Sequence, residues 1–106
     1  MSDYILVQTT LSEREDAMRL AKSITGAKLT ACTQIDGPIQ SVYWWKEKLE
    51  SEEEWRCTFK TKRLLYAELE AKIKEIHPYE TPEIIAIPII EGSPDFLKWI
   101  DEEVKS

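Results

Sequence analysis

The alternation of extended and helical segments constrains the fold of this chain more than any other feature. Short apolar runs bounded by polar residues predict buried strands, and apolar residues that recur every three or four positions predict helices with one buried face. Both patterns occur along the chain. In chain order the expected elements are a strand at 4–10, a helix at 12–26, the two strands of a long hairpin at 29–43 and 55–60, a helix at 61–77, a strand at 82–90 and a helix at 93–104.

This order predicts an α+β fold of the ferredoxin-like βαββαβ type with an extra C-terminal helix, occupying residues 1–106 as a single domain. Right-handed crossovers place both long helices on one face of a four-stranded antiparallel sheet. In the return strand of the hairpin, Trp55, Cys57 and Phe59 fall on one face. The opposite face of the sheet needs a cover, and only the C-terminal helix of the same chain remains to provide one.

Helix caps and breakers mark the ends of several segments. Ser12 and Thr61 are expected to cap the two long helices. The Gly37–Pro38 pair interrupts the first hairpin strand and predicts a bulge or a bend. Pro88 cannot donate to a ladder, so the strand at 82–90 is expected at an edge or at a bulge.

Large aromatic side chains occupy both faces of the first hairpin strand. Trp44 points to one face, and Tyr43 and Trp45 point to the other. Aromatic surface of this size is rarely left exposed on a monomer, so we expect these three residues to lie in a subunit interface. The alternative is that the C-terminal helix covers them within one chain.

Charge and cysteine content exclude several functional classes. The net charge is −6, without the basic excess that nucleic-acid binding needs. Apolar runs are too short for a membrane span of ~20 residues. The two cysteines form neither a disulfide framework nor a CxxC motif, which favours a reduced, cytoplasmic location. Glutamates at 50 and 52–54 are interpreted as a solvated part of the hairpin.

The only histidine, His77, begins a stiff His-Pro-Tyr-Glu loop. It is a candidate metal ligand, with Glu80 and Glu83 as nearby oxygen donors. The alternative is a structural one, in which a cationic ring caps the C-terminus of the preceding helix.

Other chemistry-bearing residues are dispersed. The expected register separates Cys32 from Cys57 by six residues, roughly 20 Å, so the two thiols are predicted to stay unlinked. Lys60 is a candidate anion-binding residue or a solvated lysine. Neither a nucleophile paired with a base nor a glycine-rich phosphate loop is present, so an enzyme is not expected.

Taken together, these residues resemble the divalent-cation tolerance (CutA) family over almost the whole chain. The most specific match is His77-Pro78-Tyr79-Glu80 with Pro82-Glu83-Ile84. The remaining matches are Gln8-Thr9-Thr10, Ala31-Cys32, Ser41-Val42-Tyr43-Trp44-Trp45, Glu54, Lys60-Thr61 and Trp99. Some members carry a second histidine immediately before the motif histidine, where this chain has Ile76.

The resemblance implies a cytoplasmic homotrimer, related in architecture to the PII signalling proteins, that confers tolerance of copper and other divalent cations. On this basis we expect Cu(II) or a similar cation to be bound by His77, Cys32 and Glu83. One alternative is a PII-like module that binds a small anionic ligand between subunits, and another is a trimeric scaffold for a partner protein. The ligand-binding residues expected for the PII-like module are Tyr43, Trp45, Lys60, Tyr79 and Glu80.

Overall fold

The computed structural model describes residues 3–106, and its elements follow the order that the sequence predicts. A short 3₁₀ turn at Arg63–Leu65 precedes the second helix. The elements are β1 (Tyr4–Leu11), α1 (Arg14–Gly26), β2 (Cys32–Trp45), β3 (Lys48–Lys62), α2 (Tyr66–Ile76), β4 (Ile85–Pro88) and α3 (Pro94–Glu103).

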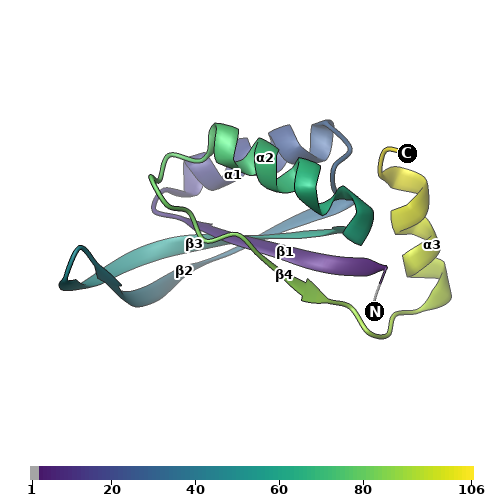
Figure 1. Cartoon of the computed structure of the whole chain (residues 1–106). Coiled ribbons are helices and arrows are strands. Elements are labelled where there is room, and N and C mark those ends of the chain that lie inside the picture. Colours follow the sequence, from purple (N-terminus) through teal and green to yellow (C-terminus); the bar gives the residue numbers. More distant parts are fainter. Residues whose placement is uncertain (1–2) are drawn as a thin grey trace.

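The strands form one antiparallel sheet in the order β2-β3-β1-β4, and α1 and α2 lie side by side on one face of it (Figure 1). This is the expected ferredoxin-like arrangement. β4 is an edge strand, which explains how Pro88 is tolerated opposite Ile5. No helix among residues 3–106 is long and apolar enough to cross a bilayer.

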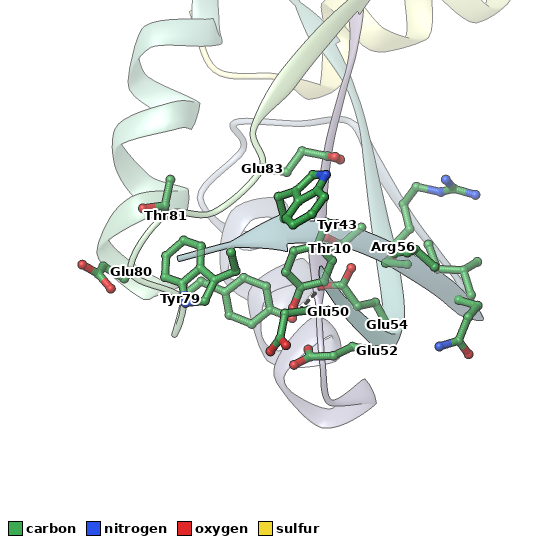
Figure 2. Close-up of a pocket in the computed structure, with 16 residues that line it drawn as sticks. Thr10, Tyr43, Glu50, Glu52, Glu54, Arg56, Tyr79, Glu80, Thr81 and Glu83 are labelled. Atoms are coloured by element: carbon green, nitrogen blue, oxygen red, sulfur yellow. Dashed lines mark hydrogen bonds between the residues drawn. The ribbon is translucent and has the colours of Figure 1, made fainter. Parts of the chain in front are cut away.

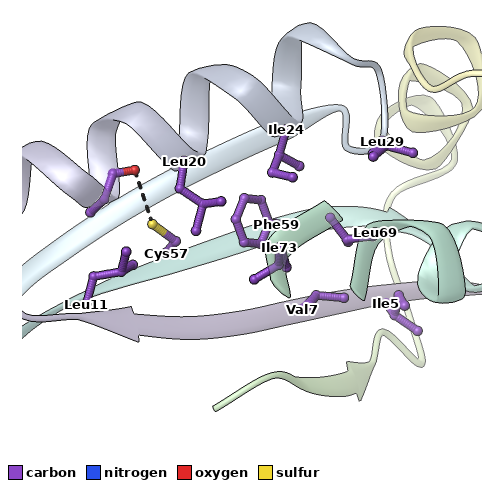
Figure 3. Close-up of a cluster of buried hydrophobic side chains, with 11 residues drawn as sticks. Ile5, Val7, Leu11, Leu20, Ile24, Leu29, Cys57, Phe59, Leu69 and Ile73 are labelled. Carbon is purple, nitrogen blue, oxygen red and sulfur yellow. Dashed lines mark hydrogen bonds between the residues drawn. The ribbon is translucent and has the colours of Figure 1, made fainter. Parts of the chain in front are cut away.

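The main core fills the space between the helices and the sheet (Figure 3). Alternate residues of β1 are buried, and Phe59 of β3 packs with them beneath Leu20 and Ile24 of α1. Full burial of each such side chain contributes roughly 1.5–3 kcal/mol. Cys57 also faces this core, where its thiol donates to the Ala17 carbonyl at 3.5 Å and burial raises its pKa to about 12.

Beyond the end of β1, the β2–β3 hairpin continues as a two-stranded arm, which we define as residues 39–54. β1 pairs with β3 only as far as Leu11 opposite Trp55, whereas the hairpin pairs as far as Trp45 opposite Lys48. Lys46 and Glu47 close it with φ angles of 49° and 67°, as in the tight turns that match strand twist. The arm projects past the body of the domain in Figure 1.

The base of the arm is marked by the predicted irregularity in β2. The register shifts between Asp36 and Ile39, around a cis peptide bond between Gly37 and Pro38. Gly37 has a φ of 149°, and a Cβ there would lie 2.9 Å from the Trp55 ring. Only glycine fits this position without displacing the ring.

Helix α3 packs at the opposite end of the sheet from the arm (Figure 1). It begins at Ser93, whose hydroxyl accepts the Phe96 N–H at 3.4 Å, as predicted from the sequence. Ile100 and Val104 pack on Leu65 in a second small cluster. The alternative in which α3 covers the aromatic residues of the arm is therefore wrong, because α3 lies at the other end of the molecule.

Three local expectations also need correction. The N-cap of α1 is Glu13 rather than Ser12, and its side chain makes no capping bond. Thr61 remains inside β3 and donates instead to the Leu29 carbonyl at 2.7 Å, so β3 ends later than predicted. The strand expected at 82–90 is confined to Ile85–Pro88.

Candidate functional site

A groove of about 940 Å³ lies along the arm, between the hairpin and the loop that joins α2 to β4 (Figure 2). Its walls come mainly from β2, β3 and this loop, which we define as residues 77–84. The lining residues are Thr10, Ile39, Gln40, Ser41, Val42, Tyr43, Trp44, Trp45, Glu50, Glu52, Glu54, Arg56, Tyr79, Glu80, Thr81 and Glu83.

Strand alternation places three carboxylates in the groove. Glu50, Glu52 and Glu54 occupy every second position of β3 and therefore share one face. Tyr43 lies opposite Glu50 in the register and brings an aromatic ring to the same face. Glu53, between two of these acids, points to the other face of the strand and is not among the lining residues.

The loop at 77–84 is attached to the sheet through His77 and Tyr79. His77 is 7% exposed, and its Nε2 lies 2.9 Å from the Thr10 carbonyl at the end of β1. The Tyr79 backbone N–H donates to His77 Nδ1 at 3.1 Å, and the two rings meet edge to face at 4.7 Å. Because Nδ1 accepts a hydrogen bond, Nε2 carries the proton and donates to Thr10.

The buried carboxylate of Glu54 completes this attachment. Glu54 is only 5% exposed, and the Tyr79 hydroxyl donates to its Oε2 at 2.7 Å. Charged acceptors form shorter and stronger hydrogen bonds than neutral ones. The wall formed by the loop is therefore held against β3 by a side-chain bond as well as by the backbone connection.

The electrostatic environment of the groove is negative. Burial raises the pKa of Tyr79, and Glu54 raises it further. The pKa of Tyr43 is raised by desolvation and by Glu52, with Glu54 and Glu50 contributing. Both phenols are consequently held neutral. Arg56, the one cationic side chain that lines the groove among residues 3–106, is engaged with Asp36 through bonds of 3.0 and 3.3 Å.

The structure brings five of the eight predicted ligand- and metal-binding residues into the groove and leaves three outside it. The five inside are Tyr43, Trp45, Tyr79, Glu80 and Glu83. Lys60 lies elsewhere, with its ammonium 5.7 Å from the Phe96 ring of α3, and Cys32 is paired with Lys60 on that part of the sheet. Lys60 does not line the groove of a single chain, and its expected contact with a ligand between subunits stays a prediction.

The structure places His77 at the end of α2, but its ring matches neither of the two interpretations in full. It occupies the C-cap position of α2, where its backbone N–H donates to the Ile73 carbonyl. Its ring is not the expected cation, because burial lowers its pKa below the ordinary 6.5. Both ring nitrogens are already engaged, so coordination of a metal through the imidazole requires one of these bonds to break.

The metal ligands predicted from the sequence do not form a compact set. Among residues 3–106, no three His, Cys, Asp or Glu side chains are close enough together to hold one metal ion. The carboxylates of the groove are suitable oxygen donors for divalent cations, but they are spread along it. The described residues of a single chain therefore hold no preformed set of metal ligands.

The cysteines are both free, as the sequence predicts, although the predicted spacing is wrong. Cys57 lies opposite Ile35, so Cys32 is three positions away along β2 and not six. The bulge at Gly37–Pro38 and the exact place of the turn account for this difference. The two thiols stay apart because Cys57 faces the core and Cys32 faces the other side of the sheet.

Sequence reasoning missed the charged side chains of β3 that line the groove. Glu50, Glu52 and Glu54 were interpreted as part of a solvated acidic run, and Arg56 was not singled out. The available signal was the alternate spacing of the three acids on the same strand as the buried Cys57 and Phe59. That spacing identifies a shared face, but not the loop that closes over it.

Comparison with known proteins gives a consistent result over nearly the full length. A family model described as "CutA1 divalent ion tolerance protein" matches residues 5–103. A relative from Archaeoglobus fulgidus, named divalent-cation tolerance protein CutA, is 41% identical over 105 residues, covering 99% of this chain and 100% of the relative. The crystal structure of CutA1 from Oryza sativa superposes with a TM-score of 0.95 at 36% identity, covering 99% of this chain and 96% of that one. CutA1 from Pyrococcus horikoshii superposes with a TM-score of 0.91 at 36% identity, covering 96% and 99%.

Proposed function

Because the chain belongs to the CutA1 divalent ion tolerance family, we propose that it is a cytoplasmic, homotrimeric protein that binds divalent cations and has no catalytic role. The observation that carries this proposal is the arm. It carries exposed apolar side chains that fit a subunit contact, and it also carries the carboxylates that line the groove.

The apolar face of the arm supports self-association. Trp44 is 72% exposed, and its register partner Leu49 is 62% exposed. Val42 lies on the same face and is 64% exposed. Burial of an aromatic side chain removes on the order of 150–250 Å² from water, so a second copy of the chain gains substantially by covering this face. Sedimentation equilibrium at micromolar concentration tests the trimer, and a mass equal to one chain would exclude it.

The sheet also has two open edges, β2 and β4, on opposite sides. If the β2 edge of one copy contacts the β4 edge of the next, the contact is head-to-tail. Such contacts form a closed ring when the rotation between successive copies divides a full turn evenly. A ring of three copies agrees with this geometry. In such a ring, we propose that side chains of a neighbouring copy supply the metal donors that a single chain lacks.

The groove is the proposed cation site. Its carboxylates, including Glu52 and Glu83, supply oxygen donors, and the negative environment around Tyr43 and Tyr79 favours positive charge. For a given set of donors Cu(II) binds more tightly than the other divalent first-row ions, so Cu(II) is the expected strongest ligand. Two free thiols agree with a reducing compartment.

Calorimetric titration with Cu(II) tests this site through one matched pair of variants. Glu52→Gln removes a groove carboxylate, whereas Glu53→Gln removes the same charge from the other face of the same strand. We expect Glu52→Gln to weaken Cu(II) binding by on the order of tenfold and Glu53→Gln to leave it unchanged. Equal effects of the two variants, or no binding by the wild-type protein, would overturn the proposed site.

An anionic ligand is less compatible with this groove. Its carboxylates repel negative charge, and its one arginine is already paired with Asp36. Lys60, which the anionic alternative requires, lies outside the groove.

A further inference from the structure

We propose that the arm of one copy docks on the next copy at the sheet face beside α3. This inference rests on the homotrimer proposed above and identifies the surface that receives the arm. Three observations support it: the distribution of exposed apolar side chains, the symmetry that a ring of three copies requires, and the charges of the two surfaces.

Large apolar side chains that are exposed gather in two places. The first, which we define as the arm patch, lies where Trp44 and Leu49 are register partners and consists of Val42, Trp44 and Leu49. The second, which we define as the receiving patch, lies on β4, on α3 and between them, and consists of Ile85, Ile87, Ile90, Phe96 and Trp99. Among residues 3–106, the other large exposed apolar side chains are Trp45, whose ring is contacted by Lys46, and Leu64.

The strand register joins the two parts of the receiving patch on one face of the sheet. Ile87 lies opposite Leu6, and Leu6 lies opposite Lys60. These three side chains form a row across β4, β1 and β3 on the face away from α1 and α2, because the alternate residues of β1 face the core. The Phe96 ring lies 5.7 Å from the Lys60 ammonium, and its centroid is 5.6 Å from that of Trp99. The aromatic pair of α3 therefore extends the row.

A ring of three copies requires each contact to join two different surfaces. When the same surface of two chains meets, the contact has two-fold symmetry and joins a pair, whereas head-to-tail contacts build a ring of three. The arm patch therefore needs a different apolar surface on the next copy, and the receiving patch meets this need. The open edges of the sheet agree, since β2 carries Val42 and Trp44, and β4 carries Ile85 and Ile87.

The charges of the two surfaces are complementary. The turn of the arm has Lys46 and Lys48 on either side of Glu47. Residues 91–103, which include α3, have a single lysine, and Asp101 among them is paired with Lys62 of its own chain. The other acidic side chains of this segment are all exposed, and they are Glu91, Asp95, Glu102 and Glu103. Opposite charges across a contact fix its orientation and suppress alternatives, so the basic tip of the arm is directed toward α3 of the next copy.

Cross-linking between introduced cysteines tests which surfaces meet. The background is Cys32→Ala, because Cys57 is fully buried. Leu49→Cys combined with Ile87→Cys places one thiol in each patch, and we expect a short bismaleimide to join this variant into species of two and three chains. Leu49→Cys combined with Leu64→Cys is the matched control. Leu64 is 86% exposed but belongs to neither patch, so the control should remain as single chains on a denaturing gel.

Sedimentation velocity of Ile87→Ala gives an independent measurement. We expect this variant to weaken association by about five- to tenfold, because the arm no longer covers the full isoleucine side chain. Leu64→Ala should associate as the wild type does. Unchanged association of Ile87→Ala would overturn the proposed contact.

The cross-linking results separate this contact from the trimer itself. If the native mass is that of three chains but Leu49→Cys with Ile87→Cys is cross-linked no more than the control, the docking proposal is overturned and the trimer stands. Cross-linking of Leu49→Cys alone into pairs would also overturn it, because the arm would then meet another arm. A single-chain mass of the wild-type protein would overturn both proposals.

Discussion

The hydroxyl of Tyr79 donates to the buried carboxylate of Glu54 over 2.7 Å and so joins the loop after α2 to the middle of β3. These residues are 25 positions apart in the sequence. Their bond sets one wall of the groove at a fixed distance from the carboxylates of β3. It also gives a buried negative charge a partner, without which its burial would be costly.

Tyr79→Phe should therefore destabilise the protein. It keeps the ring against His77 but leaves Glu54 without the phenol donor, and bonds to charged groups contribute about 1.5–3 kcal/mol. Urea unfolding provides the measurement. Tyr66→Phe is the control, because the Tyr66 hydroxyl bonds to the more exposed Glu70. If Tyr79→Phe lowers the free energy of unfolding by no more than Tyr66→Phe does, the role given to the Tyr79–Glu54 bond is contradicted.

Thr9→Val should stabilise the protein by about 1 kcal/mol. The Thr9 hydroxyl is fully buried and makes no hydrogen bond within the described residues. Its removal from water therefore destabilises the folded state, and no hydrogen bond offsets this cost. Valine has nearly the same shape and no polar atom. Thr61→Val is the opposite case, because Thr61 donates to the Leu29 carbonyl, and that variant should lose stability. A lower melting temperature for Thr9→Val would show that its hydroxyl has a partner.

The stability of the protein should fall as the pH drops below 6.5, and His77 should account for part of that fall. Burial lowers the folded-state pKa of His77 below its ordinary 6.5. Between these two values the unfolded chain binds more protons than the folded one, so the free energy of unfolding rises with pH across this interval. Above pH 6.5 the contribution of His77 is fully present. His77 is the only histidine, so its ring signals in an NMR titration are unambiguous. A folded-state pKa above 6.5 would contradict the account of this ring.

Trp44→Ala should weaken subunit association with little effect on the folding of a single chain. The side chain is 72% exposed and contributes little to the core of its own subunit. If a second copy covers it, its loss should shift the assembly toward smaller species, as measured by sedimentation velocity over a range of concentrations. Leu64→Ala serves as a comparison, since Leu64 is even more exposed and lies outside the arm. An unchanged mass for Trp44→Ala across the whole range would exclude the arm as the contact.

The fold was predictable because its elements are encoded locally. The alternation around Trp55, Cys57 and Phe59, and the apolar stripes of α1 and α2, identify the core face without knowledge of any contact. Helix starts were less predictable. Thr61 has the side chain of a cap, but it lies in the ladder opposite Ile5 and bonds to the Leu29 carbonyl, so tertiary context determines its role.

The candidate site was only partly predictable, since it depends on how distant segments meet. The His-Pro-Tyr-Glu loop stands out in the sequence, and the structure places Tyr79 and Glu80 in the groove. Nothing local indicates that Tyr79 meets Glu54, or that both nitrogens of His77 are used within the fold. Lys60 was assigned to the same site from its residue type alone, and its place beside Phe96 depends on the packing of α3.

The measurement that tests the central claim most directly is the intact mass of the assembly under native conditions, with and without Cu(II). We expect a mass equal to three chains, with bound copper that survives removal of free metal. In the double variant Glu52→Gln with Glu83→Gln, the trimer should persist and the copper should be lost. If the wild-type protein has the mass of a single chain, or forms a trimer that retains no copper, the account is contradicted.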